Sequence, residues 1–555
     1  MNSSSHWNEK PNDASAGGSA CALSDSESAE PTVFRQYRAP QEHGESFVEP
    51  GFNRVEQTVQ ENQALLRGQT VFESLRRTAR TKLIEDAIRY TSVYRSVSWL
   101  EGRSAEDLAE GPILMAGHQP ALFHAGVWFK NFALSHVAKK CDALAVNLVI
   151  DNDVASGSSI RVPTLDFSTG RAHYESIPYD EAGGGVPYEQ TTIRDRDRFD
   201  RFDQAVKHAV KPLITDPCVE PLWKHARAAI ERCGVAGCAL AQARHGLEGE
   251  IGLRTLELPL GVVCRTTEFA EFVLAILTEL PRFHRCYNEA AIQYRKAHGI
   301  RSLAHPVPNL TEEDGWFEAP LWIYGNDAPT RRPAWAKLSD DHLLISDRNG
   351  RELKIDVRFP KLAAEQLANQ VSPNFKLRPR ALLTTMYSRL ILCDLFIHGI
   401  GGAKYDQLSD TIIRSYFMVT PPKFMVISAT VKLPGCSQTD DRSRIPALKR
   451  MLRDTRFQPE RFAEEADLDK TLIERKKHLL QHRPSSGSRK QWHDELARIN
   501  ETLSRSLEDK RAEIRLQLAM EQKQSASEAI LASREHPFCI FPLGYLRDVF
   551  HELLT

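Results

Sequence analysis

The sequence predicts an α/β protein with a parallel sheet, and three observations point to this fold class. Residues 113–116 form a short apolar run that ends at Gly117, residues 125–140 show the spacing of a helix, and residues 143–150 form a second apolar run. A strand, a loop, a helix and a strand within about 40 residues make a βαβ unit, whose two strands are parallel. Such sheets bind ligands outside the carboxyl ends of their strands, which here are the loops that follow residues 116 and 150.

The other elements follow from the same hydrophobic periodicity. Residues 1–45 are polar, poor in aromatic residues and broken by Gly and Pro, so we expect a disordered tail and a core over 46–435. Apolar positions at helical spacing predict helices over 54–98, 197–247, 267–298 and 404–417. Apolar runs predict further strands at 256–264, 390–397 and 424–431, with a mixed α+β insertion of short antiparallel strands at about 300–360.

Residues 455–535 differ from the core because they are highly charged and carry an apolar stripe at three-or-four spacing. A break at 483–488 predicts two long helices in an antiparallel hairpin, which is typical of a coiled-coil arm. The arm is either a plain surface hairpin or the interface of a homodimer, and we favour the homodimer because the stripe needs a partner. The apolar segment 536–555 is expected to dock on the core.

Composition bounds the function classes. The chain has 555 residues, and 72 Lys+Arg against 73 Asp+Glu give a net charge of −1, which argues against a nucleic-acid-coating protein. No apolar run is long enough to span a membrane, and residues 1–30 lack the apolar centre of a signal peptide, so a cytoplasmic protein is expected. The 10 cysteines are scattered, and Cys233 and Cys238 have no second close pair, so we expect neither disulfides nor a zinc site.

The first segment that can carry chemistry is the loop 117–126, which lies between a strand and the N-terminus of a helix. Backbone N–H groups at such a place favour anions. His118 and His124 in this loop can donate hydrogen bonds to a phosphate or carboxylate, or act as acid and base. A purely structural role for either histidine is the alternative.

Asp151 and Asp153 follow the second strand, with Asn152 between them. Carboxylates in this position can hold an amine, a ribose hydroxyl or Mg²⁺, and the alternative is a solvated turn. Because two residues one apart point in different directions in an extended chain, we expect only one of the two carboxylates to face the site.

A glycine-rich turn, 399–402, follows a third apolar run and precedes a helix that carries Lys404 and Tyr405. Its glycines allow close approach of the backbone to a ligand, although the turn is neither a Walker loop nor a complete GxGxxG motif. A tight left-handed turn is the alternative. Arg378 and its basic neighbours just before the run can bind phosphate or form a solvated patch.

Together, these segments resemble the bacillithiol-biosynthesis cysteine-adding enzymes, a family of cysteine ligases. The loop 117–126 is similar to the family's Gly-Gln-Gln-x-x-Leu-Phe-x-Gly loop, and Asp151-Asn152-Asp153 is similar to its acidic segment. Leu377-Arg378-Pro379, followed by the turn 399–402 and Tyr405, is similar to its Leu-Arg-Pro segment and Gly-rich turn. The order of parts matches over about 50–555, while the specific likeness is confined to these short segments.

The resemblance implies a Rossmann-like nucleotide-binding core, a coiled-coil dimerisation arm, and amide formation between the carboxyl group of L-cysteine and the amine of an amino sugar such as glucosaminyl-malate. It implies ATP or ADP as cofactor. From the residues themselves we predict His118, His124, Asp151 and Asp153 as catalytic residues. We predict as nucleotide-binding residues Gly117, Gln119, Arg378, Gly399, Gly401, Gly402, Lys404 and Tyr405.

The chain departs from the family pattern at three places, one of which is its acidic segment, Asp151-Asn152-Asp153 in place of Glu-Asp-His-Asp. His118 replaces a family glutamine, which favours a phosphate-binding or acid–base role for the loop. Ala403 and Lys404 stand where the family has an acidic residue, which favours the alternative function, a non-catalytic nucleotide- or metabolite-binding protein on the same fold.

Overall fold

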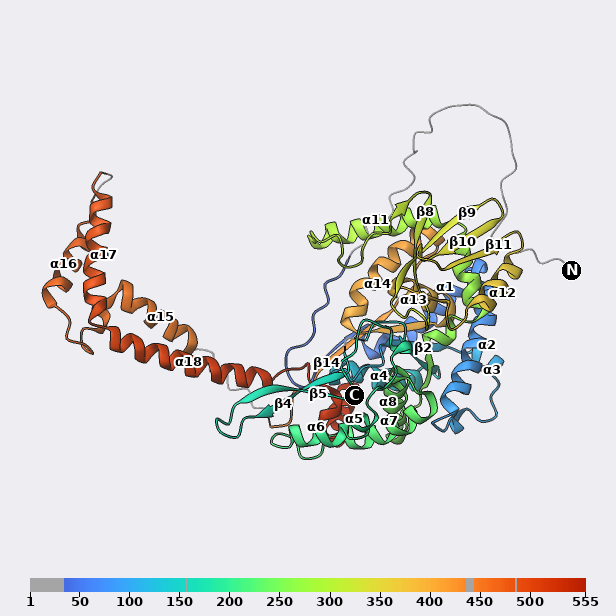
Figure 1. Ribbon diagram of the computed structural model, residues 1–555, viewed down its shortest axis with the longest axis horizontal. Coiled ribbons are helices and arrows are strands. Elements are labelled where there is room, and N and C mark those ends of the chain that lie inside the picture. The colour runs from blue at the N-terminus through green and yellow to red at the C-terminus, as the bar shows by residue number, and fades with distance from the viewer. Residues whose placement is uncertain (1–33, 156, 436–443, 485–486) are drawn as a thin grey trace, which may run out of the picture. The chain divides into compact units, whose positions relative to one another are not determined.

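The computed structural model describes residues 34–155, 157–435, 444–484 and 487–555, which form two compact units. Unit 1 comprises the described residues up to Val162, Ser176–Val431 and Arg534–Thr555, and unit 2 comprises Pro163–Glu175 and the described part of Lys432–Ser533 (Figure 1). Residues 1–33 of the expected disordered tail lie outside the described residues. The expectation is wrong for the end of that tail, because Tyr37 is buried against Ala403 and Val426.

Unit 1 is built on a six-stranded sheet, which confirms the α/β class and the parallel pairing. The strand order is β1 (Glu45–Glu49), β14 (Met425–Thr430), β13 (Leu395–His398), β2 (Ile113–His118), β3 (Leu144–Val149) and β6 (Leu256–Pro259). Every neighbouring pair is parallel except β1 with β14. The residues of β3 and β14 are all buried, as continuous apolar runs in a covered parallel sheet require.

The direction in which strands are added reverses in the middle of this sheet. From β2 the chain adds β3 and β6 on one side, and it then returns to add β13 and β14 on the other side of β2. Helix α4 (Ala125–Lys140) joins β2 to β3, and α14 (Ile400–Ile412) lies between β13 and β14. Connections therefore leave the adjacent ends of β2 and β13 in opposite directions, which opens a crevice at their carboxyl ends.

Helix α4 packs closely on β14 at Gly126, where a Cβ atom would overlap the carbonyl oxygen of Ala429. Gly126→Ala is therefore expected to lower the free energy of unfolding by about 1–3 kcal/mol, the usual cost of overpacking. The measurement is denaturant unfolding. The matched control is Gly544→Ala, whose Cβ would meet no atom within 4 Å. Equal midpoints for the two variants would contradict this close packing.

A second sheet is antiparallel, as predicted for the insertion. Its order is β11 (Glu352–Asp356), β10 (His342–Ser346), β9 (Arg332–Ser339), β8 (Trp316–Tyr324) and β12 (Lys376–Pro379), and β7 (Glu312–Glu313) pairs with β8. Leu321 and Ile323 of β8 belong to the same hydrophobic cluster as Met115 of β2 and Val146 of β3. The two sheets of unit 1 therefore share one core.

The remaining helices of unit 1 occupy most of the expected helical regions. They are α1 (Val55–Arg67), α2 (Thr70–Ser92), α3 (Ala105–Glu110), α5 (Arg196–Asp200), α6 (Phe202–Val210), α7 (Val219–Cys233), α8 (Ala236–Glu250), α9 (Leu260–Val263), α10 (Thr267–Leu277), α11 (Leu280–His298), α12 (Pro360–Gln370), α13 (Ala381–Tyr387) and α19 (Leu543–Leu554). The expected strand 256–264 stops at Pro259, and the expected helix 267–298 is divided before Pro281, which lies in the first turn of α11.

Unit 2 contains four helices, α15 (Arg444–Phe457), α16 (Lys470–Gln481), α17 (Arg489–Arg505) and α18 (Glu508–Leu531), together with parts of β4 (Ser159–Leu165) and β5 (Ala172–Pro178). The predicted break falls between α16 and α17. The predicted second long helix is divided into α17 and α18. Its stripe residues Ile499, Leu503 and Ile514 pack against Phe462 and Leu468 of the same chain. Because the stripe is covered within the chain, it does not by itself require a second subunit, and the homodimer stays a prediction.

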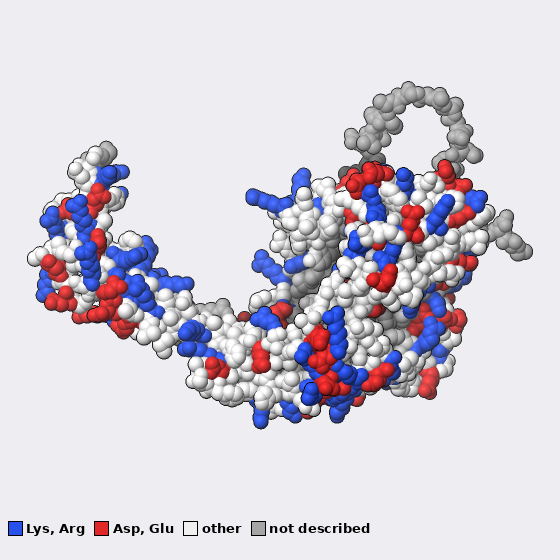
Figure 2. Space-filling view, viewed as in Figure 1, with Lys and Arg blue, Asp and Glu red and all other residues white. Residues whose placement is uncertain are grey.

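On the face of the molecule drawn in Figure 2, the charged side chains of the described residues do not gather into one basic stripe. On the face seen in Figure 2, basic and acidic side chains are interspersed over the helices of unit 2 and over unit 1. Within the described ranges, none of the helices combines the length and the apolar character that a membrane-spanning segment requires.

Candidate functional site

A cavity of about 740 Å³ lies in unit 1 at the carboxyl ends of the parallel strands, where the strand order reverses. Its lining includes Gly117, His118 and Gln119 at the end of β2, Asn152 and Asp153 after β3, His398, Gly399, Gly401 and Gly402 at the end of β13, Tyr405 and Asp406 of α14, and Trp322 of β8. A volume of this size matches the pockets that hold cofactors and small substrates. The predicted loop 117–126, Asp153 and the Gly-rich turn therefore meet in one place.

Two helix N-termini face this cavity. Helix α4 begins after His124 and α14 begins after Gly399, and both preceding residues line the cavity. Neither residue caps its helix with a side-chain hydrogen bond. The unsatisfied backbone N–H groups and the positive ends of the two helix dipoles therefore favour a negatively charged ligand.

His118 is held as a neutral imidazole. Its Nδ1 lies 3.0 Å from the carbonyl oxygen of Gln119, to which the neutral ring donates, so Nε2 carries the lone pair. Burial, together with the positive charge of Lys130, lowers the pKa of His118 to about 3. His118 is therefore suited to accept or donate one hydrogen bond, but it is a weak base at neutral pH.

Lys130 is a buried amine at the same end of β2. It lines the cavity from α4, and its Nζ donates to the carbonyl oxygen of Gly117 over 2.6 Å. Burial lowers the pKa of Lys130 to about 7, and the positive charge of Arg244 contributes to this lowering. Lys130 is not among the residues predicted from the sequence, although a lysine within an apolar helical face was a signal that could have found it.

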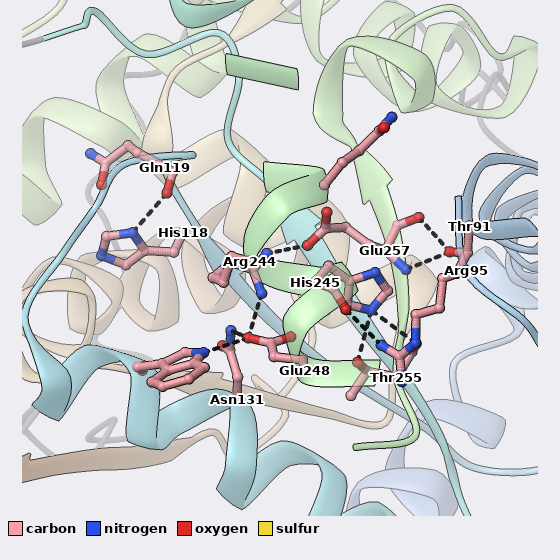
Figure 3. A network of polar contacts seen from close by, with 12 residues as sticks. Thr91, Arg95, His118, Gln119, Asn131, Arg244, His245, Glu248, Thr255 and Glu257 are labelled. Atoms are coloured by element: carbon pink, nitrogen blue, oxygen red, sulfur yellow. Dashed lines mark hydrogen bonds and ion pairs between the residues drawn. The ribbon is translucent and has the colours of Figure 1, made fainter. Parts of the chain in front are cut away.

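A network of polar side chains fixes Arg244 behind this part of the site (Figure 3). Arg244 pairs with Glu248 over 2.7 Å and with Glu257, and all three side chains are buried. The Oε1 atom of Glu248 also accepts from Trp128 Nε1 and Asn131 Nδ2, each over 2.7 Å. Helices α4 and α8 and strand β6 therefore hold the guanidinium group of Arg244 in place near Lys130 and His118.

His124 faces the C-terminal segment across the cavity. Its Nε2 lies 3.9 Å from a carboxylate oxygen of Glu535, and its buried Nδ1 has no hydrogen-bond partner in the described residues. Burial lowers the pKa of His124, with Glu535 acting in the opposite direction. Phe538 anchors this segment, since its ring lies 4.4 Å from that of Trp128 on α4. Arg534 and Glu535, at the start of this segment, thus form part of the cavity wall.

Only one of the two predicted carboxylates lines the cavity. Asp153 does so, and it accepts from Gln119 Nε2 over 2.7 Å and pairs with Arg331 over 3.1 Å. Asp151 turns away and accepts from the backbone N–H of Gly261 over 2.9 Å. Burial and the neighbouring Glu189 raise the pKa of Asp151 to about 7. The expected catalytic role of Asp151 is corrected accordingly, because this carboxyl group does not reach the cavity.

Two of the predicted basic ligands are also corrected. Arg378 is buried in β12 and binds Glu189 through two bonds of 2.9 and 3.0 Å, so it is not a phosphate clamp in the cavity. Lys404 is exposed on α14 and does not line the cavity. Arg380, which follows the end of β12, lines the cavity instead. It stacks on Trp322 at 4.1 Å and pairs with Glu318 over 2.6 Å.

A His–Asp pair at the end of β13 was not found from the sequence. His398 Nε2 lies 2.9 Å from Asp406 Oδ2, and Asp406 also accepts from Thr385 over 2.5 Å and from Arg389 over 2.7 Å. Burial would raise the pKa of Asp406, but Arg389 and His398 hold it well below its ordinary value. The ionised carboxylate accepts the Nε2–H of His398, so Nδ1 is the ring nitrogen left to exchange a proton.

Gly402 leaves room for that nitrogen. A Cβ atom at this position would lie 2.8 Å from Nδ1 of His398, which has no recorded hydrogen bond within the described part of the chain. The Gly-rich turn therefore leaves space for the imidazole ring of His398 as well as for a ligand.

Among the described residues, no group of three or more His, Cys, Asp or Glu side chains is arranged to hold a metal ion.

No protein-family model matches this chain, and no curated protein sequence is significantly similar to it.

Proposed function

We propose that the protein is a carbon–nitrogen ligase with a Rossmann-like nucleotide-binding core, which adds L-cysteine to the amine of an amino sugar such as glucosaminyl-malate. The observation that carries this proposal is the meeting of the loop 117–126, Asp153 and the Gly-rich turn around one cavity at the strand-order reversal. These are the segments on which the resemblance to cysteine ligases rests. An open α/β sheet places its ligand at such a reversal.

The residues present fit the phosphates of ATP or ADP. The two uncapped helix starts, the amine of Lys130 and the unpartnered Nδ1 of His124 are donors suited to phosphate oxygens. ATP, when bound, would supply the energy that activates the carboxylate. In this proposal Gly117, Gln119 and Tyr405 frame the nucleotide, and Arg380 holds the carboxylate end of a substrate.

Amide formation requires a base that removes a proton from the attacking amine. His398 is better suited to this role than His118, because Asp406 fixes its tautomer and leaves Nδ1 open, whereas burial makes His118 a poor base. Asp153 is placed to accept a hydrogen bond from the amine and so to orient it.

A non-catalytic binding protein is the second candidate. The observation that favours it is the pair Ala403 and Lys404, which replaces the acidic residue of the family's Gly-rich turn. Both candidates bind a nucleotide, so turnover is what separates them.

The test is the profile of low-molecular-weight thiols in the source organism with and without this gene, measured by labelling and mass spectrometry. We expect deletion to remove one cysteine-containing thiol and to raise its amino-sugar precursor. The wild-type gene should restore the thiol, His551→Ala on the exposed face of α19 should also restore it, and the double variant His118→Ala/His124→Ala should not. An unchanged profile on deletion would rule out cysteine addition and favour the binding protein.

A further inference from the structure

Lys130 stands out among the cavity residues because it is buried without a counter-charge. Only 3% of its surface is exposed, and its single recorded hydrogen bond goes to the uncharged carbonyl oxygen of Gly117. No carboxylate among the described residues forms an ion pair with it. Two of the three donor positions of its ammonium form are therefore unfilled.

The charged and titratable groups around Lys130 do not supply that counter-charge. Arg244 approaches from α8, but its charge is positive, and its own partners Glu248 and Glu257 are already bound to it. His118 approaches from the end of β2 as a neutral ring. Four further groups line the cavity and are engaged elsewhere: Asp153 with Arg331, Glu535 beside His124 and Arg534, Arg380 with Glu318, and Asp406 with Arg389.

We propose that Lys130 is the ligand of a phosphate group in this cavity, and that its amine takes up a proton from solvent as that group binds. The phosphate would replace the missing carboxylate and fill the free donor positions, next to the uncapped start of α4. The inference deepens the proposed function, on which it rests for the nucleotide as the source of the phosphate.

Proton uptake follows from the balance of charge and burial. With a pKa of about 7 in the empty cavity, Lys130 is mostly charged at pH 6 and mostly neutral at pH 8. An adjacent dianion favours the charged form and raises this pKa. Binding at pH 8 should therefore take up most of one proton per anion, and affinity should fall up to about tenfold per pH unit above pH 7.

The experiment is titration calorimetry of the full chain with sulfate, in buffers that differ in heat of ionisation and with chloride at matched ionic strength. Sulfate keeps two negative charges from pH 6 to 9, so it contributes no protons of its own. We expect the wild type to take up most of one proton at pH 8 and little at pH 6. Wild-type binding without proton uptake, or no sulfate binding at all, would overturn the inference.

Three variants assign the proton to this side chain. Lys130→Met should lose the uptake and weaken binding at least tenfold, whereas Lys130→Arg should bind without uptake because a guanidinium stays charged. Lys139→Met, at an exposed position near the end of α4, should behave as wild type. Unchanged uptake in Lys130→Met would overturn the inference.

Competition by ADP tests the nucleotide separately. If sulfate binds with proton uptake but ADP fails to displace it, Lys130 is supported as an anion ligand and the proposed function is contradicted.

Discussion

Replacing His398 by glutamine is expected to slow amide formation by about 10²–10⁴-fold, with a much smaller change in KM. The glutamine side chain can still donate to Asp406, so the partners of that carboxylate at Arg389 and Thr385 are kept. What is lost is a base that can take a proton from the amine. The measurement is steady-state formation of the cysteine amide by purified protein, with ATP, cysteine and the accumulated amino-sugar precursor as substrates.

His551→Gln is the matched control, because this histidine is exposed on α19 and does not line the cavity. Its kcat and KM should equal those of the wild type. Full activity of His398→Gln together with an inactive His118→Gln would show that the base is His118 after all.

Replacing Asp394 by alanine is expected to lower the free energy of unfolding by about 3–5 kcal/mol. Asp394 precedes β13, and its buried carboxylate pairs with Arg80 over 3.0 Å, with Arg76 over 3.1 Å and with the backbone N–H of Ile113 over 2.9 Å. Without it, two largely buried guanidinium groups lose their counter-charge. Denaturant unfolding followed by tryptophan fluorescence measures the loss.

Glu220→Ala is the control for this experiment. Glu220 pairs with Lys207 over 2.6 Å, but both side chains are well exposed, so the midpoint should hardly move. A similar small shift for Asp394→Ala would mean that water reaches Arg76 and Arg80 in the folded protein.

The fold could be predicted best where burial is complete. The run 113–116 and the run 143–150 became β2 and β3 almost residue for residue, since a strand covered on both faces is apolar at nearly every position, with Asn147 the polar exception in β3. The run 390–397 was misassigned as one strand. Its first part is a π-helix, Ser388–Leu392, because a short apolar run does not distinguish a buried helix from a buried strand.

The site could be predicted only where the chain itself places a residue at a strand end. His118, Asp153 and the Gly-rich turn were found in this way. Lys130 and Asp406 lie inside helices, and they reach the cavity only because α4 and α14 start at its edge. Whether Arg378 or Arg380 reaches the cavity depends on where β12 ends. The local sequences around the two arginines are similar, so they could not reveal this end.

The insertion of unit 2 into unit 1 has a consequence for the assembly of the cavity. The chain leaves unit 1 after Val431 and returns at Arg534, which lines the cavity wall. Closing a flexible loop of roughly 100 residues costs about 4 kcal/mol of entropy. Helices α15 and α18 run antiparallel, as contacts of Arg444 with Glu521 and of Thr455 with Arg511 require, and they draw the two ends of the insertion toward each other. A folded unit 2 thus shortens the loop, so mutations that melt these helices should weaken ligand binding although none of their residues lines the cavity.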